Sequence, residues 1–213
     1  MENIDKKALT AISKLIKEAP NRVALLGGSF DPPHLGHACI ALSLLSSDAA
    51  DEVWVLPCAN HPHAKNLQAL HHRVHMCELA FRHLATKVKV LPIEKFLPIP
   101  SFTAQTLKHL MSLYPQTQFH WIIGADLIEQ LPTWKDATWL RENAHFSVIG
   151  REGYTVTDQT SDFQIKPYLG IEIPNVASHN LRMALAQNET NVQGLDKAVL
   201  DYISDQELYQ NKC

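Results

Sequence analysis

The sequence predicts an α/β protein in which a mostly parallel, doubly wound sheet is covered by helices on both faces. Short apolar runs alternate along the chain with segments of helical character, which is the pattern of repeated strand–helix–strand units. The runs are apolar almost throughout, as expected for strands that are buried on both sides. A chain of 213 residues is long enough to bury a large core, and its length fits one domain better than two.

The predicted strands are short apolar runs, several of which stop at a glycine or a proline. They are residues 22–28, 51–57, 87–92, 118–126, 145–150 and 168–174. The segments between and after them have helical character, and Pro132 interrupts one of them. The predicted helices are residues 35–48, 66–85, 101–115, 127–143, 178–187 and 196–209. The polar stretch 152–168 is predicted to be a long loop before the last strand.

The first twenty residues are predicted to form an amphipathic helix that ends before Pro20. Its apolar residues recur on one face, and its charged residues lie elsewhere. We expect residues 1–20 to be a helical extension that lies on a single domain formed by residues 21–213.

Composition excludes several classes of function. The net charge of −3 gives no basic stripe of the kind that holds nucleic acid, and no apolar segment is long enough to span a membrane. The twelve histidines and four cysteines lack the spacings of a zinc site, so we expect no metal bound by the protein alone. The scattered cysteines and the absence of an apolar signal core predict a cytoplasmic protein with reduced thiols.

Ligands of such sheets bind outside the carboxyl ends of the strands. Residues that directly follow the predicted strands should therefore face a common site. These are residues 27–37, 57–65, 92–106, 124–126, 151 and 174–182.

The most unusual of these segments is residues 27–37, which read GGSFDPPHLGH. It is neither a G-x-G-x-x-G motif nor a P-loop, because the P-loop lysine is absent. His34 and His37 are three residues apart at the start of a predicted helix, so both rings project from one face. The N–H groups of a first helical turn attract anions, which suggests a phosphate site. The alternative is a tight turn in which the histidines satisfy nearby carbonyl groups.

The segment resembles the G-G-[ST]-F-D-P-x-H-x-G-H signature of the nucleotidyltransferase family. Within that family the chain is most similar to the bacterial nicotinate-nucleotide adenylyltransferases. The similarity continues through LPCANHPHAK, HRVHMCELA, PSFTAQTLKHL, IIGADLIEQLPTW, NAHFSVIGREGY and YISDQELY, in the family's order. Class I aminoacyl-tRNA synthetases have a related H-I-G-H motif, but they need a much longer chain and a K-M-S-K-S loop.

The resemblance implies a Rossmann-like nucleotidyltransferase fold and a reaction of NAD biosynthesis. AMP would pass from ATP to nicotinate mononucleotide, giving deamido-NAD and pyrophosphate. The displacement is in-line and needs positioning and charge neutralisation more than a base. Mg²⁺ would be bound mainly by ATP oxygens.

The resemblance also assigns roles to individual residues. His34, His37 and Arg182 would contact the ATP phosphates as catalytic residues. Further ATP-binding residues would be Gly28, Ser29, Phe30, Gly124, Asp126, Arg151, Ser178 and His179. The acceptor would be bound by His63, Lys65, Thr103, Thr106 and Trp134.

For several residues a structural role competes with the functional one. Asp126 would either contact the ribose or cap a helix, and Asp31 would order its turn. Trp134 would either stack on the nicotinate ring or lie in the core. Ser178 is a candidate N-cap of the helix that it begins. A surface position on its helix is the simple interpretation of Arg73.

Two motifs depart from the family pattern. In HPHAK the basic position holds Ala64, and Lys65 follows one residue later. In VASHNLR, His179 replaces a threonine of the second phosphate motif, which should weaken phosphate binding without abolishing it.

These departures leave two alternative functions open. One is an adenylyltransferase of the same fold that uses nicotinamide mononucleotide or another phosphorylated acceptor. The other is a paralogue that binds nucleotides without catalysis. The sequence also leaves the oligomeric state open, a homo-oligomer included.

Overall fold

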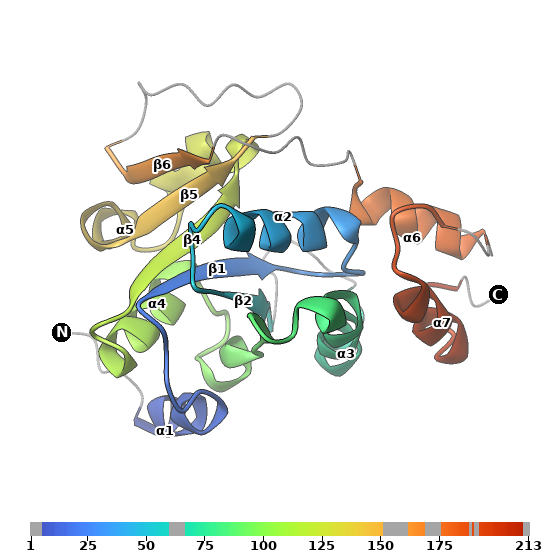
Figure 1. Ribbon diagram of the computed structural model, residues 1–213, viewed down its shortest axis with the longest axis horizontal. Coiled ribbons are helices and arrows are strands. Elements are labelled where there is room, and N and C mark those ends of the chain that lie inside the picture. Colours follow the sequence, from blue (N-terminus) through green and yellow to red (C-terminus); the bar gives the residue numbers. More distant parts are fainter. Residues whose placement is uncertain are drawn as a thin grey trace.

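The computed structural model describes residues 6–59, 67–150, 162–168, 176–187, 189 and 192–210. Within them, six strands form one sheet in the order β3-β2-β1-β4-β5-β6, and every pair is parallel (Figure 1). The strands are Arg22–Gly28 (β1), Glu52–Pro57 (β2), Val88–Val90 (β3), Gln118–Gly124 (β4), His145–Ile149 (β5) and Gln164–Tyr168 (β6). The predicted doubly wound, Rossmann-like α/β fold is confirmed.

The α-helices of this part of the chain are Lys6–Leu15 (α1), Leu35–Ser46 (α2), Leu70–Phe81 (α3), Thr103–Leu113 (α4), Ala137–Asn143 (α5), Ser178–Ala186 (α6) and Lys197–Asp205 (α7). The 3₁₀ segments are Arg82–Leu84 (η1), Ile93–Phe96 (η2) and Ala125–Thr133 (η3). The last of these contains Pro132, which accounts for the interruption expected there.

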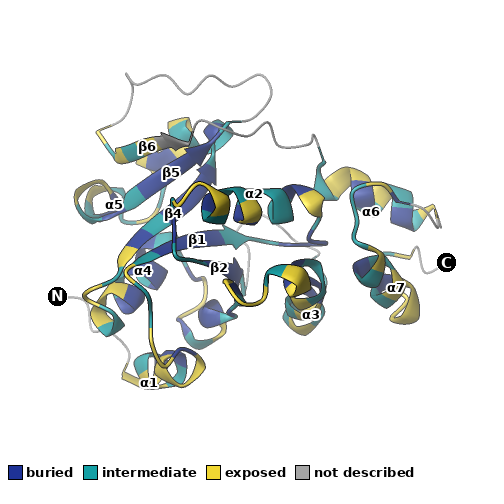
Figure 2. Cartoon of the chain, in the orientation of Figure 1, coloured by how far each residue is buried: buried dark blue, intermediate teal, exposed yellow. Residues whose placement is uncertain are grey.

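Two apolar clusters cover the two faces of the sheet. On one face α2 and α3 pack on β1, β2 and β4 through residues such as Ala41 and Phe81. On the other face α1, η2, α4, η3 and α5 share a larger cluster with Trp54, Trp121 and Phe146. Because both faces are covered, the central strands carry the buried residues that are dark in Figure 2.

The strand order reverses direction at β1, which lies between β2 and β4. In open α/β sheets this switch point is where the connections diverge and leave room for a ligand at the carboxyl ends of the strands. Gly27 near the end of β1 allows close packing there, because a Cβ at this position would lie 2.7 Å from the Trp121 ring on β4.

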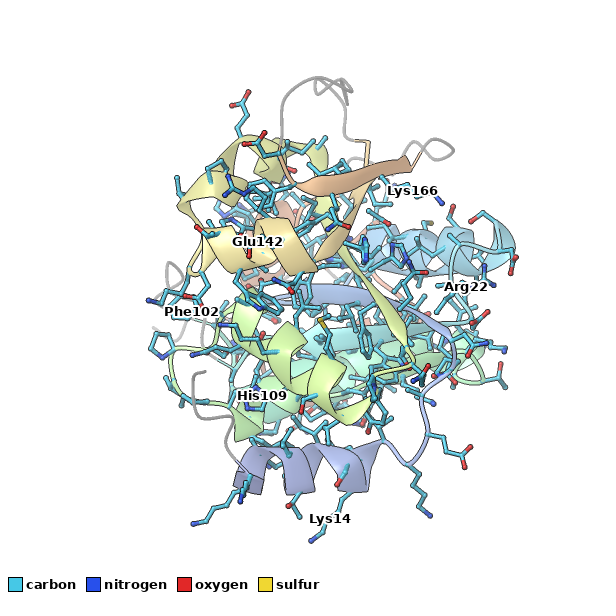
Figure 3. The ribbon with its side chains drawn as sticks, turned by 90° about the vertical axis from the view of Figure 1, so that its left-hand side faces the viewer. Lys14, Arg22, Phe102, His109, Glu142 and Lys166 are labelled. Atoms are coloured by element: carbon cyan, nitrogen blue, oxygen red, sulfur yellow. The ribbon has the colours of Figure 1, made fainter. Side chains whose placement is uncertain are left out.

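Helix α1 lies across α4 and η2 and is part of the main core. Ala8, Ile12 and Ile16 are at most 3% exposed, and the hydroxyl of Tyr114 donates a hydrogen bond to the carbonyl of Ile16 at 2.6 Å. Figure 3 shows Lys14 directed away from the protein on the opposite side of α1. Residues 6–16 thus pack on the main domain, while the extension over residues 1–20 and the boundary at residue 20 stay predictions.

The described residues of 176–210, including α6 and α7, are called here the C-terminal unit. It packs on α3 through a third apolar cluster that contains Met76, Leu181 and Ile203. Arg82 also donates to Asp196, the N-cap of α7, at 2.6 Å. The unit lies beyond the carboxyl end of β1 and beside the start of α2 (Figure 1).

The predicted loop 152–168 was wrong at its end. Strand β6 occupies Gln164–Tyr168, inside the stretch that was expected to be a loop, and most of the predicted strand 168–174 lies outside the described residues. Gln164 and Lys166 are exposed and Ile165 is partly buried. This alternation, with Pro167 in the strand, is typical of a sheet edge and is poorly recognised by a search for continuous apolar runs.

No helix in the described ranges is both long enough and apolar enough to cross a membrane.

Candidate functional site

The GGSFDPPHLGH segment forms the end of β1, a tight turn and the first residues of α2. The turn, residues 29–34, lies at the switch point of the sheet. Phe30 has a positive φ of 50° and is 2% exposed, and the Asp31–Pro32 peptide is cis. His34 is the N-cap of α2, so the turn leads directly into a helix N-terminus.

The two histidines lie side by side at this helix start. Their ring centroids are 3.8 Å apart, and the Phe30 ring packs against His37 at 4.9 Å. The backbone N–H of His34 donates to Nδ1 of His37 at 3.1 Å. An accepting Nδ1 places the proton of a neutral His37 ring on Nε2, which makes Nε2 a donor. The expected alternative was that the histidines satisfy carbonyl groups, but His37 Nδ1 accepts a backbone N–H.

Helix α6 brings Ser178 and Arg182 to the turn, although they are about 150 residues away in sequence. The Arg182 guanidinium donates to the carbonyl of Asp31 at 2.7 Å, and the Ser178 hydroxyl donates to the carbonyl of Pro32 at 3.1 Å. Ser178 is the first residue of α6, and its N-cap is Ala177, so the N-cap interpretation of Ser178 was wrong. His179 is exposed on the same helix.

Arg73 is buried, not on the surface. Its side chain is 1% exposed on α3 and donates to the carbonyls of Ser29, Cys58 and Gln68, each at 2.8 Å. It therefore ties the turn after β1 to the end of β2 and to the approach to α3. The sequence contains a signal for this burial. Arg73 lies four and eight residues before Cys77 and Phe81, which places all three on the same helix face.

Glu94 is a second buried ionisable residue that sequence reasoning did not identify. It is 7% exposed, and its Oε2 accepts the backbone N–H of Ala59 at 3.1 Å and the hydroxyl of Ser101 at 2.6 Å. It thus joins the segment after β2 to the segment that leads into α4, and both were expected to contact the acceptor. Burial raises the pKa of Glu94 above its usual range.

A pH dependence of stability follows from Glu94. Because its pKa is higher in the folded protein, its contribution to stability is fully present below the unfolded pKa of about 4.3 and is lost as pH rises through the folded value. Glu94→Gln cannot ionise and lacks this loss. Urea unfolding should therefore show the stability of Glu94→Gln rising relative to wild type between about pH 4 and pH 8. A difference that is constant or falls with pH would contradict the assignment.

Helix α4 begins at Thr103, with Phe102 as its N-cap. Thr103 is partly buried at the helix start, as expected. Thr106 is fully buried, and its hydroxyl has no hydrogen-bond partner among the described residues. A buried hydroxyl is normally satisfied, so Thr106 is a candidate contact for a ligand.

Gly124 ends β4 and leads directly into η3. A Cβ at Gly124 would collide with Oδ1 of Asp126, which folds back over the end of the strand. Gly124 itself is the N-cap of η3, so the alternative that Asp126 caps this helix was wrong. Both residues lie at the carboxyl end of β4, beside the turn on β1.

Trp134 follows η3 and is partly buried. Its ring meets Phe146 edge-on, with centroids 6.2 Å apart, and it packs against the main core. One side of the Trp134 ring thus packs on the core, which agrees in part with the alternative that Trp134 is a core residue. Stacking of the remaining surface on a nicotinate ring stays a prediction.

The family model of cytidylyltransferase-like proteins matches residues 25–192. The chain belongs to this family. It is 35% identical over 192 residues to a probable nicotinate-nucleotide adenylyltransferase of Anaeromyxobacter dehalogenans (strain 2CP-C), covering 88% of this chain and 96% of the relative. It is 34% identical over 197 residues to the one of Bacillus cereus (strain G9842), covering 89% and 99%.

A solved structure with the same fold is the Plasmodium falciparum nicotinic acid mononucleotide adenylyltransferase complexed with NaAD. Its TM-score is 0.78 at 22% identity, and the match covers 89% of this chain and 98% of the solved one. This likeness shows that the two chains share one fold.

Three expected site residues of this cytidylyltransferase-like protein, His63, Lys65 and Arg151, lie outside the described residues. The other predicted ATP-binding and catalytic residues lie in three places: the end of β1 with the turn and the start of α2, the carboxyl end of β4, and α6. Their roles toward a ligand stay predictions.

Proposed function

We propose that this protein is a nicotinate-nucleotide adenylyltransferase that joins ATP and nicotinate mononucleotide to give deamido-NAD and pyrophosphate. The observation that carries this proposal is the turn at the switch point, where two adjacent imidazoles stand at a helix N-terminus beside Arg182. The names of the relatives at 34–35% identity support the choice of reaction.

In the proposed reaction a phosphate oxygen of nicotinate mononucleotide attacks the α-phosphorus of ATP. The bond from that phosphorus to the bridging oxygen breaks, and pyrophosphate leaves with the electron pair. The attacking phosphate is already ionised at neutral pH, so no general base is required. His34, His37, Arg182 and the N–H groups of α2 would stabilise the charge on the transferring and leaving phosphates.

For the acceptor, Thr103 and Thr106 of α4 would bind the pyridine carboxylate, and Trp134 would stack on its ring. Mg²⁺ would be held mainly by the phosphate oxygens of ATP. Bound there, it would neutralise phosphate charge. No group of three or more acidic, histidine or cysteine side chains in the described residues is placed to hold a metal ion.

A single assay tests the proposal. Pyrophosphate release is measured with ATP, Mg²⁺ and either nicotinate or nicotinamide mononucleotide. We expect a higher kcat/KM with the nicotinate form. A preference for the amide, or for neither acceptor, would indicate another adenylyltransferase, and ATP binding without turnover would indicate a non-catalytic paralogue.

Trp134→Ala should raise the KM for nicotinate mononucleotide by about tenfold and leave the KM for ATP nearly unchanged. Trp139→Ala is the matched control, because Trp139 is also partly buried and packs under Lys108 at 5.2 Å. Both variants should lose some thermal stability, but only Trp134→Ala should change the acceptor KM. Equal changes of both KM values would mean that Trp134 is a core residue only.

A further inference from the structure

The Asp31 side chain is buried under the turn and is only 1% exposed. Its Oδ1 accepts the hydroxyl of Tyr209 at 2.7 Å and the backbone N–H of Gln68 at 3.2 Å. Its Oδ2 is buried and has no hydrogen-bond partner among the described residues. A buried carboxylate with few donors depends strongly on each of them. Among the described residues, Tyr209 has the single side-chain hydroxyl that donates a hydrogen bond to the Asp31 carboxylate.

The same residue is held from its backbone side by Arg182, which donates to the Asp31 carbonyl at 2.7 Å. Asp31 is three residues before His34, so a displacement of Asp31 would move both Arg182 and the start of α2. The C-terminal unit makes a further contact with this helix start, where the N–H of Leu35 donates to the carbonyl of Gly194 at 2.8 Å.

We propose that Tyr209 is a positioning residue for the ATP phosphates, which it serves by holding Asp31 so that the turn presents His34, His37 and Arg182 together. This inference rests on the proposed function. Tyr209 lies beyond residues 25–192, which the family model matches.

The geometry of the chain end supports a specific placement of this hydroxyl. Tyr209 has a positive φ of 63°, and Glu207 has one of 50°, which is unfavourable for residues with a Cβ. Leu208 between them is 7% exposed in the cluster with Met76 and Ile203. The backbone thus turns sharply after α7, with Leu208 anchored in the core and Tyr209 directed at the turn.

The hydroxyl is also a dependable donor. Burial, together with the adjacent Asp31 carboxylate, raises the pKa of Tyr209 far above its usual range. The phenol therefore remains protonated across the pH range in which the enzyme would work.

The test compares Tyr209→Phe with Tyr202→Phe. Tyr202 lies on α7 of the same unit, but its hydroxyl contacts Nδ1 of His72 at 2.8 Å and not the turn. Tyr209→Phe should raise the KM for ATP by about tenfold while the KM for nicotinate mononucleotide stays within about twofold. Tyr202→Phe should change neither KM. Thermal unfolding of both variants reports any general loss of stability.

A second arm tests the route through Asp31. In an Asp31→Ala background, adding Tyr209→Phe should have little further effect on ATP binding, because the acceptor of the hydrogen bond is already gone. Titration calorimetry measures the dissociation constant for ATP alone. It is applied to the wild type, to Tyr209→Phe, to Asp31→Ala and to the double variant.

The outcomes separate the inference from the proposed function. A wild type that binds ATP without turnover contradicts the proposed function, while the ATP dissociation constants still decide the role of Tyr209. Equal ATP binding by wild type and Tyr209→Phe, equal changes of both KM values, or an undiminished effect in the Asp31→Ala background would each overturn the inference. A wild type that does not bind ATP would overturn both.

Discussion

His37→Ala should lower kcat for the proposed adenylyl transfer by at least about 100-fold. Nδ1 of His37 accepts the His34 N–H, so Nε2 is the donor available to a phosphate oxygen. Such a donor matters most when negative charge moves onto the leaving phosphate in the transition state. The loss should therefore appear mainly in kcat and less in the KM for ATP.

His75→Ala is the control for this variant. His75 is exposed on α3 and contacts Glu78, away from the turn. It should keep wild-type turnover. His37→Ala also removes the acceptor of the His34 N–H and should lose about 1 kcal/mol of stability, which thermal unfolding will measure separately. Turnover of His37→Ala within about threefold of wild type would remove His37 from the catalytic residues.

Arg73→Met should lower the free energy of unfolding by about 3–5 kcal/mol. Methionine keeps much of the length of the side chain but leaves the carbonyls of Ser29, Cys58 and Gln68 without their donor. Urea unfolding measures the loss. Folded Arg73→Met should also bind ATP more weakly. Arg73 holds the carbonyl of Ser29, and Ser29 belongs to the turn that is proposed to bind the ATP phosphates.

Arg82→Met provides the comparison, because Arg82 is the C-cap of the helix that contains Arg73. Arg82 donates to Asp196 and to the Leu79 carbonyl, but its side chain is 36% exposed. Solvent screens such a pair, so the expected loss is about 1 kcal/mol or less. Similar losses in the two variants would mean that the three buried hydrogen bonds of Arg73 contribute little.

The success of the fold prediction has a simple physical cause. Strands buried on both faces need continuous apolar runs, and β1, β2 and β4 show them clearly. Edge strands need only one apolar face, so the pattern of Gln164–Tyr168 predicts a loop where the structure has a strand. Interior helices were recognised from their spacing, but their ends were less certain, as the N-cap of α6 illustrates.

The turn and the start of α2 were recognisable because their information is local. Glycine, proline and the His34–His37 spacing act within eleven consecutive residues, where chain geometry alone restricts what can form. Thr103, near the start of a predicted helix, and Gly124 and Asp126, at the end of a predicted strand, could be placed from the sequence for the same reason.

The contacts that hold this turn depend on residues distant in sequence. Arg73 lies on α3, Arg182 on α6 and Tyr209 in the turn after α7. Each reaches a backbone carbonyl of the turn or the Asp31 carboxylate. Local propensity describes each of these residues only as part of a helix or a chain end. Their partners are set by the packing of α3, α6 and α7 around the end of β1, and an unpaired polar group becomes costly only once that packing has excluded water.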